Sequence, residues 1–155
     1  MTTQTQQAIQ AGQILVVAAN AGHARFFARE KKFSPLRELE TRLHPESRMH
    51  GRELDRDAPG QVFQSGNPSE DSMGEASDSK RREAEKFARE IAAELKKARS
   101  RGSLERVVLV AEPSFLGLLR SKLDEPTRAK VVLEIPKNLA TEPARVVQAA
   151  IDAAF

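Results

Sequence analysis

The chain of 155 residues is long enough for one full-sized hydrophobic core, so a single domain is expected. It contains no cysteine, which excludes disulfide bonds and thiol chemistry. The formal net charge of +3 is too small to imply a nucleic-acid partner by itself. Charge is unevenly distributed, however, because residues 44–79 are mainly acidic and residues 80–101 are mainly basic.

Membrane insertion is not expected. The start of the chain is polar and lacks the basic segment that opens a secretion signal. The first apolar run, residues 14–19, is far shorter than the roughly 20 residues of a membrane span. The sequence therefore predicts a cytoplasmic protein in which residues 1–12 form a flexible end.

Three strands are predicted in the first third of the chain. Residues 13–19 are apolar, and residues 24–29 follow them after a turn at Asn20 and Gly22. In residues 36–43 the side chains of Leu39, Thr41 and Leu43 alternate with charged ones, a pattern typical of a strand with one solvated face. These strands are predicted to form an antiparallel meander.

Residues 44–79 are predicted to be a long loop. The segment contains Pro45, Pro59 and Pro68, several glycines and many acidic residues. A loop of this length is usually either functional or disordered. Only Val62 and Phe63 are expected to pack against the sheet.

The rest of the chain alternates helices with strands. A helix is predicted over residues 79–101, where apolar side chains recur every three or four residues, and Gly102 is expected to end it. Residues 106–111 and 130–135 are apolar runs typical of buried strands. A helix that begins at Pro113 follows the first run, and a helix capped by Thr141 follows the second. The predicted core positions of the first and last helices are Ala84, Phe87, Ala88, Ile91, Leu95, Ala98, Val146, Val147, Ala150, Ile151 and Ala154.

The element order β-β-β-α-β-α-β-α predicts one α/β domain over residues 13–155. Short turns followed by right-handed crossovers give a five-stranded mixed sheet in the order 3-2-1-4-5, with helices on both faces. This arrangement resembles the ribonuclease H-like topology and that of the middle domain of the archaeal and eukaryotic peptide release factor.

No residue pattern identifies a metal centre or a cofactor site. Ribonuclease H-like sheets are catalytic when carboxylates from adjacent strands hold two metal ions. Residues 13–29 contain no Asp or Glu, and Glu112 and Glu134 alone are too few. The histidines follow no ligand spacing and are expected at the surface or in the loop; they are His23, His44 and His50.

Two small residues near Pro113 have structural interpretations. Ser114 lacks the Gly-x-Ser-x-Gly context of a nucleophile and is interpreted as the N-cap of the helix. Gly117 costs its helix about 1 kcal/mol relative to Ala. Close packing of this helix on the sheet is the interpretation that explains the glycine.

Basic side chains supply the binding candidates. Lys80, Arg81 and Arg82 begin the long helix, and Arg120 lies in the next helix. These side chains could contact phosphates, and a solvated surface is the alternative. The chain has neither Trp nor Tyr, so base stacking has no support.

Five groups of segments carry a family resemblance. They are Ile14–Ala19 with Ala24–Phe27, Leu54 with Asp57–Phe63, Glu83–Ile91, Leu109–Arg120 and Lys137–Leu139, of which Pro113–Arg120 is the most specific. Together they resemble the bacterial family of host attachment proteins, labelled "protein required for attachment to host cells". The family often has Asp where this chain has Asn20 and His where it has Ser72.

The resemblance implies two different functions. The family name implies a non-enzymatic role in attachment to host cells through an unidentified protein partner. The family is also similar to bacterial relatives of the release-factor middle domain, which implies a ribosome- or RNA-associated factor that hydrolyses peptidyl-tRNA. In the release factor a Gly-Gly-Gln loop enters the ribosome, and Gln61, within Pro59-Gly60-Gln61, is the weak catalytic candidate that this second resemblance implies.

Overall fold

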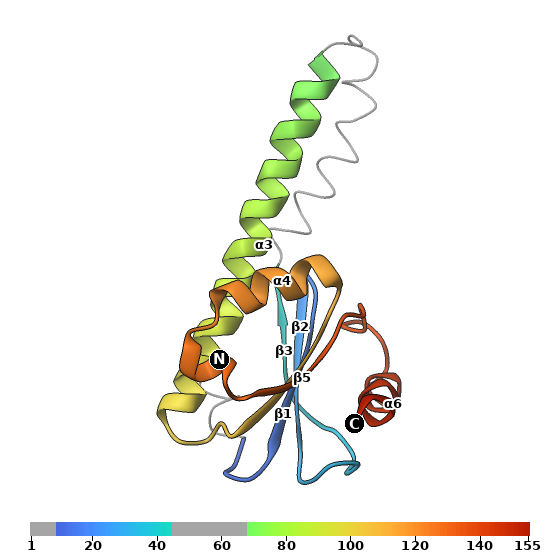
Figure 1. Ribbon diagram of the computed structural model, residues 1–155. Helices are drawn as coiled ribbons and strands as arrows, with labels where there is room; N and C mark the ends of the chain where they lie inside the picture. Colours follow the sequence, from blue (N-terminus) through green and yellow to red (C-terminus); the bar gives the residue numbers. More distant parts are fainter. Residues whose placement is uncertain (1–8, 45–67) are drawn as a thin grey trace.

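The computed structural model describes residues 9–44 and 68–155, and the side chains of all of these except residues 68–76. Five strands form one mixed sheet in the order β3-β2-β1-β4-β5 (Figure 1). The strands are β1 (Ile14–Ala19), β2 (His23–Arg29), β3 (Arg37–Leu43), β4 (Arg106–Ala111) and β5 (Val131–Ile135). The predicted five-stranded mixed sheet and its strand order are confirmed.

Helices cover both faces of this sheet, as predicted (Figure 1). They are α3 (Pro68–Ser100), α4 (Pro113–Lys122), α5 (Glu125–Arg128) and α6 (Ala144–Ala154). α3 and α4 pack on one face, and α6 packs on the other. The short helix α5 was not predicted; Asp124 caps it by accepting the N–H of Thr127 at 3.0 Å.

The inner strands β1 and β4 pair in parallel and consist mainly of Val, Leu, Ile and Ala. Every residue of β1 is buried, because helices cover both of its faces. Alternate side chains point to opposite faces, so Leu15 and Val17 join the core with α3 and α4, whereas Ile14 and Val16 join the core with α6. The larger core includes Phe26, Phe87, Ile91, Leu95, Leu109 and Phe115, and the smaller core includes Phe27, Val108, Val110, Val147 and Ile151.

Helix α3 begins at Pro68 and extends well beyond the sheet (Figure 1). The prediction of a loop is therefore wrong for residues 68–79. Proline is favoured in the first turn of a helix, so Pro68 is compatible with the start of α3. The rest of the predicted loop, including Val62, Phe63 and Gln61, lies outside the described residues.

The end of α3 is fixed by Gly102, as predicted. Gly102 has a φ of +80°, and its N–H donates to the carbonyl of Arg99 at 2.9 Å. The N–H of Ser103 donates to the carbonyl of Ala98 at 3.1 Å. This pair of bonds is a Schellman motif, which satisfies the last carbonyl groups of the helix and turns the chain toward β4.

Strand β3 contains one residue more than its partner requires. Consecutive residues of β2 lie opposite Glu40 and Glu38, so that Leu39 forms a bulge between them. Leu39 packs on the larger core, whereas Leu43 is exposed. The prediction that Leu39, Thr41 and Leu43 share one buried face is therefore wrong, because the bulge breaks the alternation.

Strand β5 is an edge strand and not a buried one. Val107 of β4 pairs with Val131, and Val108 pairs with Leu133, which leaves Val132 between the two pairs. Val132 is 49% exposed. The prediction of a buried strand is wrong here, because Val132 forms a bulge and is exposed, although the predicted strand order already places β5 at the edge of the sheet.

Two predicted boundaries also differ. Ile9 is buried in the larger core, and the carbonyl of Gly12 accepts a hydrogen bond from Arg106 at 2.9 Å. The predicted flexible end is thus wrong for residues 9–12, and residues 1–8 lie outside the description. Thr141 does not cap α6, because Pro143 occupies the N-cap position of that helix.

Candidate functional site

Four strands end at the same edge of the sheet. β1, β4 and β5 are mutually parallel neighbours, and β3 runs in the same direction because two antiparallel pairings separate it from β1. In open α/β sheets, ligands bind outside the carboxyl ends of the strands. A ligand site is therefore expected at this edge, which we call the carboxyl edge.

A cleft of about 440 Å³ opens at the carboxyl edge between α3 and α4. Its lining residues are Ala21 from the β1–β2 turn, Lys80, Arg81 and Ala84 from α3, and Ser114 and Leu118 from α4. We call it the basic cleft, because two cationic side chains meet apolar walls there. Pockets with an apolar lining and a few polar groups are typical ligand sites.

The sequence of α3 places Lys80 and Arg81 at the rim of the basic cleft. Phe87 on the following turns is buried in the larger core, which fixes the rotation of the helix. The side chain of Arg81 is 74% exposed, and its Nε atom lies 3.5 Å from Glu85. Exposed pairs of this kind contribute little stability. Arg81 can therefore exchange Glu85 for an anionic ligand at low cost.

The start of α4 forms the other wall of the basic cleft. Pro113 is the first helical residue, and the side chain of Glu112 at the N-cap position makes no capping hydrogen bond. The Ser114 hydroxyl donates to Glu112 at 3.3 Å, so the prediction that Ser114 is the N-cap is wrong. The first N–H groups of a helix have no partner within the helix. Such N–H groups can donate to a ligand, although the carboxylate of Glu112 opposes an anion there.

A buried histidine lies at the carboxyl edge beside the cleft. His44 follows β3, its Nε2 atom is 2.9 Å from the Glu83 carboxylate, and its ring stacks on Phe87 at 5.0 Å. The backbone N–H of His44 donates to the carbonyl of Gly22 at 2.9 Å. His44 was predicted to lie at the surface or in the loop; it does lie in the segment that follows β3, but it is buried. The available signal was its position directly after a strand, with Glu83 directly before the core residue Ala84.

The β1–β2 turn is held by the side chain of Asn20. Its Oδ1 atom accepts the N–H groups of Gly22 and His23, both at 2.9 Å. Its amide donates to Oδ1 of Asn138 at 3.1 Å. Asn20 therefore connects the turn that carries Ala21 to the loop that follows β5.

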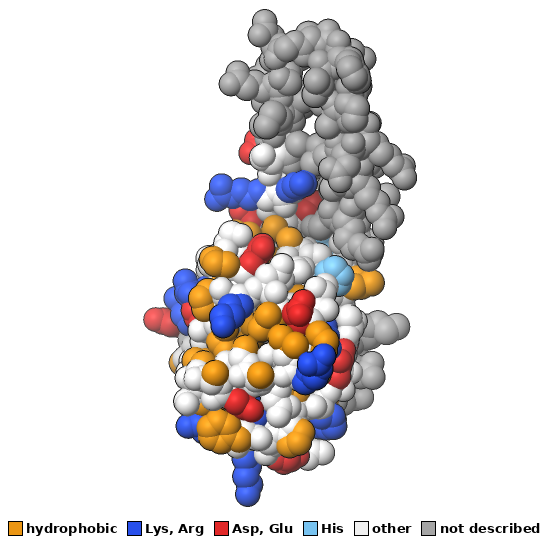
Figure 2. All heavy atoms as spheres, turned by 90° about the vertical axis from the view of Figure 1, so that its right-hand side faces the viewer, with side chains coloured by type: hydrophobic (Ala, Val, Ile, Leu, Met, Phe, Trp, Pro, Cys, Tyr) orange, Lys and Arg blue, Asp and Glu red, His pale blue; other side chains and the backbone are white. Residues whose placement is uncertain are grey.

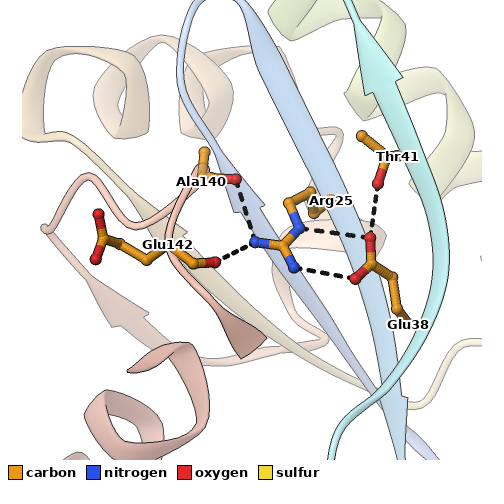
Figure 3. Close-up of polar contacts among 5 residues, drawn as sticks. All are labelled: Arg25, Glu38, Thr41, Ala140 and Glu142. Carbon is orange, nitrogen blue, oxygen red and sulfur yellow. Dashed lines mark hydrogen bonds and ion pairs between the residues drawn. The ribbon is translucent and has the colours of Figure 1, made fainter. Parts of the chain in front are cut away.

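A second network fixes that loop from the other end (Figure 3). Arg25 donates to the carbonyl of Ala140 at 3.4 Å and to the carbonyl of Glu142, and it pairs with Glu38 at 3.0 Å. Thr41 also donates to Glu38, at 2.7 Å. The hydrogen bond from Arg25, followed by the one from Thr41, lowers the pKa of Glu38. The network is thus a structural clamp between β2, β3 and the loop before α6.

The structure brings together only two of the four predicted binding residues. Lys80 and Arg81 line the basic cleft, whereas Arg82 is exposed outside its lining. Arg120 donates to the carboxylate of Glu134 on β5, and this hydrogen bond is the main reason why the pKa of Arg120 is raised. Arg120 is therefore held against β5 and does not line the cleft.

The predicted explanation of Gly117 is also wrong. A Cβ atom added at Gly117 would meet no atom of the described residues within 4 Å. Close packing of α4 on the sheet therefore does not account for this glycine.

The basic side chains at the carboxyl edge are suited to anion recognition. Within residues 9–44 and 77–155, whose side chains the structure describes, no group of three or more His, Asp or Glu side chains is placed to hold a metal ion. Lys80 and Arg81 can bind a negatively charged group, while Ala84 and Leu118 can contact an apolar part of the same ligand.

The fold and the site together define an α/β protein with a basic cleft at the carboxyl edge of a five-stranded mixed sheet. The family described as "protein required for attachment to host cells" matches residues 15–151. The chain belongs to this family, which confirms the resemblance noted above. The curated proteins with which the chain was compared include no match.

Proposed function

We propose that this chain is a non-enzymatic, cytoplasmic binding protein that contributes to attachment to host cells and binds its partner at the basic cleft. The observation that carries the proposal is the meeting of Lys80, Arg81 and Ser114 with apolar walls in a cleft of about 440 Å³. The family is described by its requirement for attachment to host cells. A cleft of this size suits a small ligand or a single anchoring group of a larger partner.

The contacts of the His44 ring support a binding function over a catalytic one. His44 is stacked on Phe87, hydrogen-bonded to Glu83 and buried beside the cleft. A general base must reach the proton that it abstracts. Because its ring is engaged in packing, His44 stabilises the edge on which the cleft is built.

The test is charge reversal at the cleft. A strain that lacks the gene is complemented with the native chain or with the variant Lys80→Glu/Arg81→Glu, and cells attached to host tissue are counted. We expect the variant to attach as poorly as the deletion strain, because the charge that binds the partner is inverted. Full attachment by the variant would contradict the proposal.

The matched control is Arg101→Glu/Lys130→Glu. Both positions lie at the opposite edge of the sheet, beside the start of β4 and of β5. This variant has the same net charge as the cleft variant and should restore attachment. Equal amounts and equal melting temperatures of both variants ensure that only the location of the charge differs.

A ribosome- or RNA-associated factor is the alternative proposal. Arg81 and Arg82 are exposed on α3, which projects beyond the sheet and could follow a phosphate backbone (Figure 1). Cosedimentation with ribosomes that weakens with salt and with charge removal at Arg81 and Arg82 would support it. If the native chain hydrolyses peptidyl-tRNA on stalled ribosomes and the variant Gln61→Ala does not, that factor is an enzyme.

A further inference from the structure

The turn between β2 and β3 carries an exposed aromatic side chain on a strained backbone. The N–H of Ser34 donates to the carbonyl of Lys31 at 3.0 Å, which closes a four-residue turn with Phe33 in its third position. The φ of Phe33 is +72°, in the left-handed region where Gly or Asn is usual. The side chain is 55% exposed, so burial does not offset the strain. Strain of this kind is often retained for a functional contact.

A second exposed ring lies beside this turn. Phe155 follows α6 and is 36% exposed. The ammonium group of Lys32 lies 5.3 Å from the ring centroids of both Phe33 and Phe155. Lys31 is exposed as well. We call these four residues the aromatic–lysine tip.

A buried arginine holds the two halves of the tip together. The side chain of Arg29 donates to the carbonyl of Ser34 and to the carboxylate of Asp152 on α6, each at 2.9 Å. The nearby Glu30 accepts a hydrogen bond from Gln13 at 2.5 Å. The tip is therefore preorganised, and the two adjacent carboxylates are already engaged.

The tip lies at the end of the molecule opposite the projecting part of α3, where the β2–β3 turn extends below the sheet (Figure 1). Figure 2 shows hydrophobic side chains exposed beside Lys and Arg side chains at this end of the face that carries α6. The tip is small and protruding. A stable protein–protein interface needs about 20–30 residues on each side, so its size favours a different kind of partner.

We propose that the aromatic–lysine tip docks on the headgroup surface of a bilayer that contains anionic lipid. Phenyl rings can enter the boundary between headgroups and acyl chains, and lysines near the surface are attracted by anionic headgroups. Both features occur together in the tip. Among the described residues no helix is long and apolar enough to cross a membrane, so the contact is peripheral.

Vesicle cosedimentation tests the proposal. We expect the native chain to bind vesicles of phosphatidylcholine mixed with phosphatidylglycerol but not vesicles of phosphatidylcholine alone, and we expect added salt to weaken binding. The variant Lys31→Gln/Lys32→Gln should lose about 25-fold in affinity, or about fivefold for each lysine. Failure of the native chain to bind the anionic vesicles would overturn the proposal.

The decisive variant is Phe33→Gly, because a purely structural role and a docking role predict opposite changes. Glycine relieves the strained φ, so the melting temperature should stay the same or rise. Vesicle binding should nevertheless fall at least about tenfold, because one inserted ring is lost. The control Leu43→Ala removes another exposed apolar side chain, at the far end of β3, and should bind as the native chain does.

Two results would exclude docking on lipid. Unchanged vesicle binding in Phe33→Gly would show that the ring does not enter the membrane. Binding of the native chain to soluble polyglutamate but not to anionic vesicles would assign the tip to an acidic protein.

Discussion

The carboxylate of Glu94 on α3 lies 3.5 Å from the guanidinium group of Arg42 on β3, and only 2% of the Glu94 side chain is exposed. Arg42 also pairs with Glu40, at 3.4 Å, so that two carboxylates share one cation. Within the described part of the chain, one oxygen of each carboxylate has no hydrogen-bond partner. Burial raises the pKa of Glu94, the charges of Arg42 and Lys97 oppose this effect, and the charge of Glu40 adds to it.

This arrangement predicts that Glu94→Gln stabilises the protein at neutral pH. Because the pKa of Glu94 is higher in the folded state, the protonated group stabilises the fold below the unfolded-state pKa of 4.5. That contribution is lost as the pH rises through the folded-state pKa. Glutamine stays neutral throughout, so a gain of about 1 kcal/mol at neutral pH should vanish near pH 4.5.

Thermal unfolding across this pH range measures the effect. A gain of about 1 kcal/mol corresponds to a rise of roughly 2–4 °C in melting temperature for a chain of this size. The control is Glu105→Gln, at an exposed position before β4. Its melting temperature should equal that of the native chain at every pH. A pH-independent gain in Glu94→Gln would show that packing, and not protonation, is responsible.

Gly117→Ala should stabilise α4. A Cβ atom at this position meets no described atom within 4 Å, and alanine is favoured over glycine in a helix by about 1 kcal/mol. The melting temperature should rise by roughly 2–4 °C. A decrease would reveal a steric contact that the structure does not show.

Phe87→Ala should be strongly destabilising. The ring is fully buried, stacks on His44 at 5.0 Å and lies 6.1 Å from the ring of Phe115. Removal of a buried phenyl ring typically costs about 3–5 kcal/mol. Urea unfolding should show this loss with little change in the slope of the transition. An unchanged midpoint would contradict the placement of Phe87 in the core.

The strand order can be predicted from the sequence because it follows from local features. Short turns at Asn20 and Lys31 join neighbouring antiparallel strands, and intervening helices require parallel crossovers. The bulge at Leu39 adds a single residue, and the alternation of polar and apolar residues in the sequence does not predict it. Only the register of β3 against β2 shows it.

The basic cleft was only half predictable for a related reason. The charge pattern identified Lys80 and Arg81 but could not separate them from Arg82 and Arg120, which lie outside the lining. Ser114 lines the cleft because α4 packs against α3. The apolar periodicity of each helix predicts its buried face but not how the two helices align. Tertiary contacts of this kind become visible only in the folded chain.

Asn20 offers a test of the turn at the carboxyl edge. Asn20→Ala removes the acceptor of two N–H groups and the donor to Asn138, and should cost about 1–3 kcal/mol. Asn20→Asp keeps the acceptor for both N–H groups, and the Asn138 amide can rotate to donate to the new carboxylate.

We therefore expect Asn20→Asp to unfold within a few degrees of the native chain, whereas Asn20→Ala unfolds clearly earlier. Thermal unfolding of the two variants side by side measures the difference. Equal losses in both would contradict this expectation and would mean that Asn138 does not rotate, so that the loss of its contact dominates. Asn138→Ala is the variant that isolates this contact.

Because four strands end at one edge, the side chains that could recognise a ligand lie on turns, on a short stretch of α3 and on the first turns of α4, apart from the apolar layers between sheet and helices. Substitutions at Lys80, Arg81 or Ser114 need not disturb the residues that hold the sheet together. Related chains could therefore diverge in what they bind while the scaffold is inherited unchanged. Selection for a new partner would act on a few residue positions at one end of the domain.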